Sequence, residues 1–254
     1  MMLLVDIGNT RVKWARVQNG HLSIGTPLMH REQSLVVIWD TLWGAIPLPE
    51  RVVVACVAGG GIAASLTAWC IAHWGVRPEF VSAGAAACGV SSGYRVPSEL
   101  GVDRWLAMIA ARQLPEFDGR ALCVVGCGTA LTVDVVTADG RHLGGWIAPG
   151  LGLMRQLLAQ GTAVRTADTA NVANCSEFGH GTVEAVTAGT LQAAAGMVLQ
   201  AMALAQQRVN GVPLGVLTGG DADTLLPLLP GAVGVVPDLV LHGLVQLVGQ
   251  QEIG

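Results

Sequence analysis

Hydrophobic and polar residues recur along the chain with two different periods, one typical of strands and the other of helices. A short apolar run at 3–7 predicts a buried strand, and apolar and polar residues alternating at 11–17 predict its hairpin partner, with one face in water. Beyond this hairpin the pattern predicts helices and strands in turn: helix 31–43, strand 52–57, helix 61–74 and strand 79–82. The first part of the chain therefore combines a hairpin with parallel strands that helices connect.

The same plan restarts in mid-chain. A polar loop with glycines near 89–97 leads into a helix predicted at 100–113, which ends before Pro115. We expect a boundary at 115–119, so that residues 1–117 form an N-terminal half and residues 118–254 a C-terminal half. The second half is predicted to contain strand 121–125, strand 129–136, a turn at 138–140, strand 142–147, helix 182–208, strand 214–218, a helix from about Asp221 and helix 238–250.

Each half begins with a buried strand that breaks into a glycine turn. The first strand runs into Gly8, Asn9 and Thr10, and the corresponding strand of the second half runs into Gly128 and Thr129. Backbone N–H groups and hydroxyls at such a tight turn form a shape that holds a phosphate group. Two related turns of this kind suggest a nucleotide held between two related halves.

Composition and charge point to a small-molecule ligand. The chain has 254 residues, a formal net charge of −4 and only 14 Lys and Arg, so we expect no binding to nucleic acid or to an anionic membrane.

The six cysteines lack paired metal-ligand spacing and the N-terminus lacks a secretory signal, so we expect buried thiols in a reducing cytoplasm. Polar residues interrupt the apolar stretch 183–205, which we interpret as a buried helix and candidate dimer face rather than a membrane span.

Six motifs, in order, resemble those of the type III pantothenate kinases over nearly the whole chain. They are Asp6-Ile-Gly-Asn-Thr-Arg-Val-Lys13, Gly101-Val-Asp-Arg104, Gly128-Thr-Ala-Leu-Thr-Val-Asp134, Gly144-Gly-Trp-Ile-Ala-Pro-Gly150, Gly181-Thr182 and Thr218-Gly-Gly220. The resemblance implies an α/β protein with the duplicated ribonuclease-H-like fold of acetate and sugar kinases, Hsp70 and actin, with two mixed-sheet halves and the active site in the cleft. It also implies a homodimer that transfers the γ-phosphoryl group of ATP to pantothenate, giving 4′-phosphopantothenate at the start of coenzyme A synthesis.

The resemblance assigns the contacts to ATP and Mg²⁺ to the two glycine turns. The second turn would supply Gly128 and Thr129, and the first would supply Asp6, Ile7, Gly8, Asn9, Thr10, Arg11, Val12 and Lys13. The Asp6 carboxylate would face the metal-bound triphosphate. From the residues alone, Asp6 also fits an aspartate that only satisfies N–H groups of its own turn, and Lys13 fits a solvated lysine. Thr132 and Asp134 follow at strand spacing and either point toward the ligand or cap the sheet.

The resemblance places the pantothenate site at the start of helix 100–113. Asp103 would be the catalytic base that accepts the hydroxyl proton. The contacts to pantothenate would come from Tyr94, Gly101, Val102, Asp103, Arg104 and, across a dimer interface, Thr182. Without the family pattern, Asp103 and Arg104 also fit a solvated helix start, Tyr94 an amphipathic loop residue and Thr182 an ordinary helix N-cap.

One position departs from the family pattern. Where this chain has Gly126, the family usually has a carboxylate that helps to hold a monovalent cation, K⁺ or NH₄⁺. We therefore expect activity to depend only weakly on that cation, unless a neighbour such as Asp134 supplies the charge. Two other functions stay open: a catalytically weakened relative that acts as a regulatory or interaction protein, and another kinase or phosphohydrolase of the same fold. The Gly-x-Asp-Arg and Gly-Thr elements argue against the second.

Overall fold

The computed structural model describes residues 1–30, 34–164 and 178–253, which group into two compact units. Unit 1 comprises Met1–Cys88, Tyr94–Ala110 and Leu239–Gly254, and unit 2 comprises Gly89–Gly93 and Ala111–Asp238. These units differ in three respects from the halves expected from the sequence, 1–117 and 118–254. The segment 89–93 belongs to the second unit. The second unit already includes the end of the helix before Pro115, and the last helix of the chain returns to the first unit.

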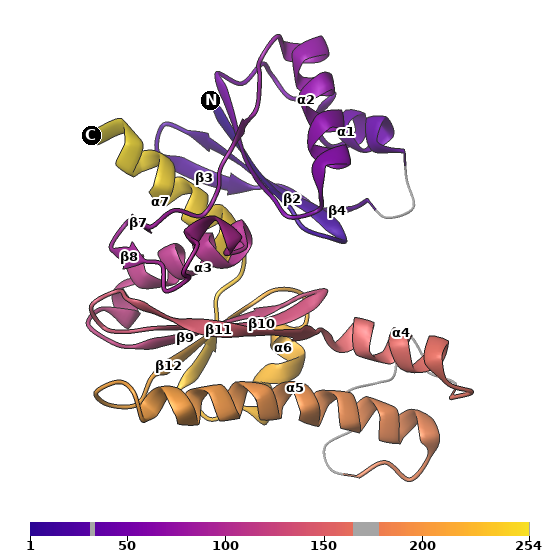
Figure 1. Cartoon of the computed structure of the whole chain (residues 1–254). Helices are drawn as coiled ribbons and strands as arrows, with labels where there is room; N and C mark the ends of the chain where they lie inside the picture. The colour runs from indigo at the N-terminus through magenta and orange to yellow at the C-terminus, as the bar shows by residue number, and fades with distance from the viewer. Residues whose placement is uncertain (31–33, 165–177, 254) are drawn as a thin grey trace. The chain divides into compact units, whose positions relative to one another are not determined.

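Groups of strands are followed by one or two helices along the chain (Figure 1). The strands are β1 (Met2–Ile7), β2 (Arg11–Gln18), β3 (His21–Ile24), β4 (Leu28–Met29), β5 (Arg51–Cys56), β6 (Glu79–Phe80), β7 (Ala86–Ala87), β8 (Val90–Ser91), β9 (Leu122–Cys127), β10 (Ala130–Val136), β11 (His142–Pro149), β12 (Leu214–Thr218) and β13 (Val233–Val235). The α-helices are α1 (Leu35–Trp43), α2 (Gly60–Trp74), α3 (Val102–Gln113), α4 (Leu151–Gly161), α5 (Thr182–Gln206), α6 (Ala222–Leu225) and α7 (Leu239–Ile253). Of the predicted helix 31–43, residues 31–33 lie outside the described residues.

The two main sheets repeat one topology. Their strand orders are β3-β2-β1-β5-β6 and β11-β10-β9-β12-β13. In each sheet the first two strands form an antiparallel hairpin, which β3 or β11 extends antiparallel. The last two strands of each sheet add in parallel on the other side. The parallel strands need helical crossovers, which the intervening helices provide. This duplication confirms the expected pair of mixed-sheet halves.

Both faces of the sheet in unit 1 are covered. On one face Leu3 and Val5 pack with α1 and α2, where Trp39 and Trp43 stack with ring centroids 5.4 Å apart. On the other face Leu4 packs with side chains of α3 and α7. The prediction that β2 has one face in water was wrong, because Val12 on one face and Ala15 on the other are fully buried, each in one of these two cores.

Helix α5 forms the main support of the sheet in unit 2. Leu191 and Val198 of α5 pack against Cys123 and Val125 of β9 in a shared core. Among the described residues α5 alone is long and apolar enough to cross a membrane, and half of its most apolar window is buried inside the protein. The packing agrees with the interpretation of this stretch as a buried helix.

Candidate active site

The first glycine turn joins β1 to β2 and is held by backbone hydrogen bonds. The Gly8 N–H donates to the Arg11 carbonyl at 3.2 Å, and the His30 N–H donates to the Thr10 carbonyl at 3.1 Å. The His30 ring adds a second contact, because its Nε2 lies 2.7 Å from the Gly8 carbonyl and must donate to it. His30 is a supporting residue that sequence reasoning missed, since nothing near it in the chain resembles a binding motif.

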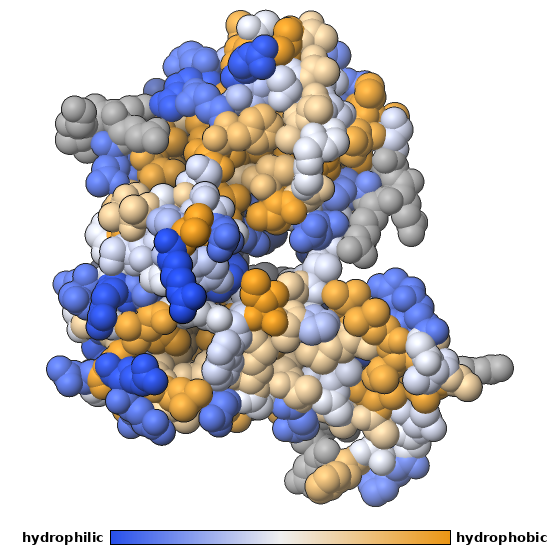
Figure 2. All heavy atoms as spheres, viewed as in Figure 1, coloured by the Kyte–Doolittle hydropathy of each residue, from blue (hydrophilic) through white to orange (hydrophobic). Residues whose placement is uncertain are grey.

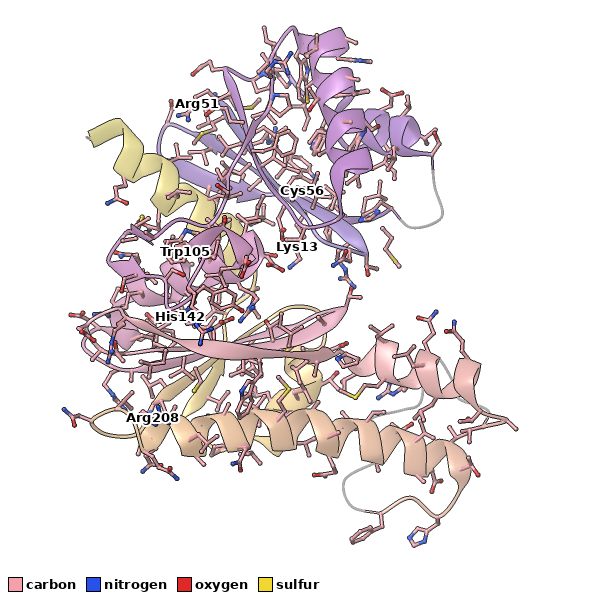
Figure 3. The ribbon with its side chains drawn as sticks, viewed as in Figure 1. Lys13, Arg51, Cys56, Trp105, His142 and Arg208 are labelled. Carbon is pink, nitrogen blue, oxygen red and sulfur yellow. The ribbon has the colours of Figure 1, made fainter. Side chains whose placement is uncertain are left out.

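Asp6 and Lys13 lie directly opposite each other at the base of this turn, in the antiparallel register of β1 and β2. Both side chains are half-buried. They share the sheet face of Leu4 and Ala15, which is the face that α3 and α7 cover. A carboxylate and an ammonium are thereby brought to one side of the sheet beside the turn, and Figure 3 shows Lys13 at this place on β2.

These residues fit a Mg²⁺ ion that is held mainly by phosphate oxygens. Magnesium in nucleotide sites usually takes only one or two carboxylates and otherwise binds phosphate and water. Within residues 1–30, 34–164 and 178–253, no cluster of three or more His, Cys, Asp or Glu side chains offers a complete metal site. A single carboxylate such as Asp6 beside a phosphate-type turn suits this kind of binding.

The second turn joins β9 to β10 and is one residue shorter than the first. The Gly128 N–H donates to the Ala130 carbonyl at 3.1 Å, and the Gly150 N–H at the end of β11 donates to the Thr129 carbonyl at 2.9 Å. A Cβ atom would meet its nearest neighbour at 3.6 Å at Gly8 and at 3.8 Å at Gly128, which are ordinary contacts. Packing within the protein therefore does not demand glycine at either turn, whereas the close approach of a phosphate would.

The two turns differ at their bases. The register that pairs Asp6 with Lys13 in the first unit pairs Gly126 with Thr132 in the second. A Cβ atom at Gly126 would lie 2.6 Å from the Thr132 Oγ1, so the threonine side chain occupies the space next to the backbone. Gly126 brings no side chain to this position, so the second unit has no carboxylate where the first has Asp6.

Asp134 does not replace the missing carboxylate at this position. It pairs across the strands with Val124, two residues before Gly126. Its side chain is 2% exposed, and its Oδ1 lies 2.9 Å from the Nε2 of His142. Of the two interpretations of Asp134, the structure supports the one in which it completes the sheet.

The predicted pantothenate residues gather at the N-terminus of α3 in unit 1. The Gly101 carbonyl accepts the first helical hydrogen bond, from the Trp105 N–H at 3.0 Å. The Asp103 carboxylate accepts the Arg104 N–H through Oδ1 at 2.8 Å and is half-buried. The partial positive charge of a helix N-terminus favours the ionised carboxylate. A carboxylate therefore lies at the start of the helix, next to the buried Val102.

Arg104 and Tyr94 form the other part of this cluster. Arg104 is only 6% exposed, and its Nη1 donates to the Tyr94 hydroxyl at 2.8 Å. The guanidinium also lies over the tyrosine ring, 5.6 Å from its centroid. The interpretation of Arg104 as a solvated residue at a helix start is therefore wrong. A guanidinium fixed in this way can donate to an anion.

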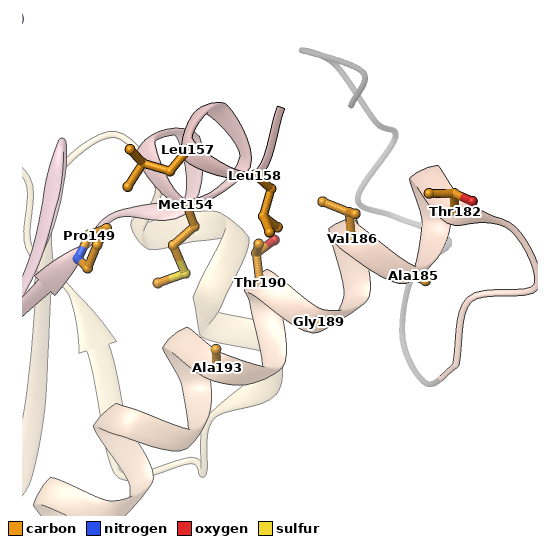
Figure 4. Close-up of a pocket in the computed structure, with 10 residues that line it drawn as sticks. All are labelled: Pro149, Met154, Leu157, Leu158, Thr182, Ala185, Val186, Gly189, Thr190 and Ala193. Atoms are coloured by element: carbon orange, nitrogen blue, oxygen red, sulfur yellow. The ribbon is translucent and has the colours of Figure 1, made fainter. Parts of the chain in front are cut away.

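Thr182 lies in unit 2, at the first residue of α5. The N-cap of this helix is Gly181 and no side-chain hydrogen bond caps it, so the ordinary N-cap role expected as an alternative for Thr182 is wrong. Thr182 instead lines the end of a groove of about 680 Å³ between α4 and α5, whose other lining residues are mostly apolar (Figure 4). Helix α4 was not predicted from the sequence, and this groove depends on it.

The site residues divide between the two units. Asp6–Lys13, Tyr94 and the residues 101–104 belong to unit 1, and Gly128, Thr129 and Thr182 belong to unit 2. Within unit 1, the structure brings Tyr94 together with Arg104 and places Asp6 on the sheet face that α3 covers. Within unit 2, it holds the second turn at the end of β9, and Thr182 at the start of α5.

Comparisons with known proteins agree with this geometry. The family model for type III pantothenate kinase matches residues 2–203. A type III pantothenate kinase of Nitrosococcus oceani is 39% identical over 249 residues, covering 97% of this chain and 93% of the relative.

Solved structures agree on the fold alone, since their sequence identities are low. A Campylobacter jejuni protein described as a Baf-family transcriptional activator has a TM-score of 0.63 at 17% identity and covers 99% of this chain and 100% of its own. A Sinorhizobium meliloti protein described as a 2-dehydro-3-deoxygalactonokinase has a TM-score of 0.58 at 15% identity, covering 99% of both chains. The duplicated ribonuclease-H-like fold of sugar kinases is therefore present, and the chain belongs to the type III pantothenate kinase family, whose members phosphorylate pantothenate with ATP at the start of coenzyme A synthesis.

Proposed function

We propose that Asp103 is the base of the phosphoryl transfer and that Arg104 and Tyr94 hold the carboxylate of pantothenate. The primary hydroxyl oxygen of pantothenate attacks the γ-phosphorus of ATP. A new O–P bond forms as the bond to the β,γ-bridging oxygen breaks, which gives 4′-phosphopantothenate and ADP. The hydroxyl proton passes to the Asp103 carboxylate, which the helix N-terminus keeps ionised before the reaction.

The two glycine turns serve as phosphate clamps in this proposal. N–H groups of Asn9, Thr10 and Thr129 hold phosphate oxygens, Gly8 and Gly128 let the phosphates approach the backbone closely, and Lys13 supplies a positive charge. Mg²⁺ bound to the triphosphate would neutralise part of its charge, with Asp6 as the carboxylate facing it. Most of the rate enhancement comes from positioning and charge neutralisation, because phosphoryl transfer requires little covalent chemistry from the protein.

One observation carries the assignment of the substrate site. Arg104 is almost fully buried, and its Nη1 donates to the Tyr94 hydroxyl at 2.8 Å, so the planar guanidinium is held in a fixed orientation at the start of α3. A guanidinium fixed in this way is suited to donate two parallel hydrogen bonds to a carboxylate. Pantothenate has one carboxylate at one end and the reacting hydroxyl at the other, so a cation and a base one residue apart at the start of α3 suit the two ends of the substrate.

The chain is further proposed to act as a cytoplasmic homodimer in which α4 and α5 face the partner. Apolar surface is visible over these helices (Figure 2), and it includes the exposed Leu157, Leu158 and Val183. Such a face next to Thr182 agrees with a substrate contact made across the interface. A charged residue in the groove, as in Val186→Glu, should give a monomer by light scattering, whereas Val36→Glu on the exposed surface of α1 should leave the dimer intact.

A coupled assay of ADP release with ATP, Mg²⁺ and pantothenate tests the proposed function. We expect phosphorylation of pantothenate and none of common hexoses. Hexose phosphorylation with pantothenate inert would indicate a sugar kinase of the same fold. Absence of both activities in a folded, ATP-binding protein would favour the regulatory relative.

A further inference from the structure

A buried histidine and aspartate form a pair in unit 2 that the proposed reaction does not use. His142 of β11 and Asp134 of β10 are 1% and 2% exposed, and the histidine Nε2 lies 2.9 Å from the aspartate Oδ1. The other ring nitrogen of His142, Nδ1, lies 3.4 Å from the backbone nitrogen of Gly93, at the long end of hydrogen bonding. Figure 3 shows His142 in the sheet of unit 2.

These contacts fix the tautomer of the histidine. A backbone N–H can only donate, so Nδ1 must accept from Gly93 and the ring proton must be on Nε2. That proton is then donated to the Asp134 carboxylate. Asp134 therefore orients the ring so that its lone pair points at Gly93, as a carboxylate orients a histidine ligand in a metal site.

Backbone contacts and one side-chain bond attach the segment 89–93 to the β10–β11 turn and the start of β11. A Cβ atom at Gly140 would lie 1.8 Å from the Gly89 carbonyl oxygen, so the two backbones are in close contact. The Ser91 N–H donates to the Gly140 carbonyl at 2.9 Å, and Ser91 forms a parallel bridge with Arg141. At Gly93 the backbone packs closely against the His142 carbonyl oxygen, and the N–H donates to the His142 ring. Among these contacts a side chain makes only the bond to the ring, so substitution can remove this bond and leave the backbone contacts in place.

Tyr94 follows Gly93 directly, at the point where the chain passes from unit 2 to unit 1. The hydroxyl end of Tyr94 is held by Arg104, and its backbone begins at the residue that His142 holds. We propose that His142, whose ring Asp134 orients, positions Tyr94 for pantothenate by fixing Gly93, which makes His142 a positioning residue for the substrate site. This inference rests on the proposed role of Tyr94.

A purely structural role of the pair makes a different prediction. If His142 and Asp134 only stabilise the sheet, then variants change the free energy of unfolding and leave the Michaelis constants of the folded enzyme unchanged. If His142 positions Tyr94, the KM for pantothenate rises while the KM for ATP does not. The two roles can be separated at the two ring nitrogens. One substitution keeps the hydrogen-bonding group at Nε2, and another keeps the group at Nδ1.

His142→Gln keeps an N–H donor near the position of Nε2 for Asp134 and removes the acceptor for Gly93. His142→Asn keeps an acceptor near the position of Nδ1 for Gly93 and removes the donor to Asp134.

We expect His142→Gln to raise the KM for pantothenate about three- to tenfold, the effect of losing one neutral hydrogen bond. His142→Asn should lower stability more, because it leaves a buried carboxylate without its donor, while its KM stays near the wild-type value. Asp134→Asn retains an acceptor for the ring and should also keep the wild-type KM.

The test compares these variants with His21→Gln, which makes the same chemical change at an exposed residue of β3. Hydrogen exchange of the Gly93 amide should be faster in His142→Gln than in the wild type and unchanged in His142→Asn and His21→Gln. Faster exchange together with a raised KM for pantothenate alone supports the proposal. Unchanged exchange, or faster exchange with the wild-type KM, overturns the positioning role. A wild-type enzyme that is inert toward pantothenate instead overturns the proposed function.

Discussion

Arg104 donates a hydrogen bond of 2.8 Å to the hydroxyl of Tyr94, and this contact joins the start of α3 to the loop before it. Tyr94→Phe removes only the hydroxyl. We expect the KM for pantothenate to rise roughly 10- to 100-fold, since losing a hydrogen bond to a charged group costs about 1.5–3 kcal/mol. Arg104→Gln should raise the KM as well. The loss of binding free energy in the double variant should be smaller than the sum of the losses in the two single variants. Additive effects would show that the two side chains act independently on the substrate.

Asp103→Asn tests the proposed base. The variant keeps an oxygen that can accept the Arg104 N–H, so the helix start should be preserved. We expect kcat to fall by about 10²- to 10⁴-fold, with the melting temperature and ATP binding near the wild-type values. Glu99→Gln is the matched control, because it neutralises an exposed carboxylate just before the same helix. Nearly full turnover of Asp103→Asn would reduce Asp103 to a residue that only starts the helix.

The repeated turns were the part of the fold and site that the sequence predicted best. Each consists of local signals, an apolar strand and then a glycine turn, and the two sheets confirm that these begin equivalent hairpins. Helix α4 was missed even though Leu151, Met154 and Leu158 follow helical spacing, because Gly150 and Gly152 at its start are typical of a loop. Glycine has a low helix propensity. In α4 the packing against α5 and the sheet outweighs this low propensity, so the helix forms.

Contacts between distant segments could not be read from the sequence. His30 reaches back to Gly8, and His142 reaches Gly93, across 22 and 49 positions of the chain. A histidine carries no periodic signal that tells which backbone atom it will meet. The return of α7 to unit 1 is a contact of the same kind, since it follows from packing on the sheet face of Leu4 and not from its neighbours in the chain.

Thr182 should act on a substrate site that belongs to the other subunit, if the proposed dimer is correct. Thr182→Ala should raise the KM for pantothenate several-fold, the effect of one lost hydrogen bond. Mixing unfolded Asp103→Asn and Thr182→Ala chains and refolding them together should restore, at low pantothenate, about a quarter of the wild-type activity, because half of the dimers then have one intact site. Activity no greater than the average of the two separate variants would show that Thr182 acts within its own subunit.

The five cysteines that the structure describes are free, and burial governs their reactivity. Burial raises the pKa of the Cys70, Cys123 and Cys127 thiols to about 12. Because the thiolate is the reactive form, these three should resist iodoacetamide at pH 8 in the folded protein and react after unfolding in urea. Raising the pH toward 12 should increase their labelling. Mass spectrometry of digested protein measures this, and rapid labelling of Cys123 at pH 8 would contradict the packing of β9.

Gly126 and Thr132 occupy the positions that Asp6 and Lys13 occupy in the first unit, and this difference predicts the response to monovalent cations. A cation site needs several oxygen ligands, and without a carboxylate it must rely on neutral oxygens that attract the ion weakly. Asp134 does not compensate, because His142 engages it within the sheet. We therefore expect the activity of the wild type to change little when K⁺ or NH₄⁺ is added to enzyme freed of both ions.

Restoring the carboxylate is the complementary experiment. In Gly126→Asp the new side chain meets the Thr132 hydroxyl, whose Oγ1 lies 2.6 Å from the Cβ position, so that threonine must rotate to make room. The variant should gain a saturable dependence on K⁺ in a Tris buffer without Na⁺ or NH₄⁺. Gly126→Asn separates the effect of the negative charge from the effect of side-chain size, since it crowds Thr132 to the same extent without attracting a cation. The activity of this variant should not change with the K⁺ concentration. A steep rise of wild-type activity from near zero on adding K⁺ would mean that neutral oxygens alone complete the site, and the weak-dependence prediction would then be wrong.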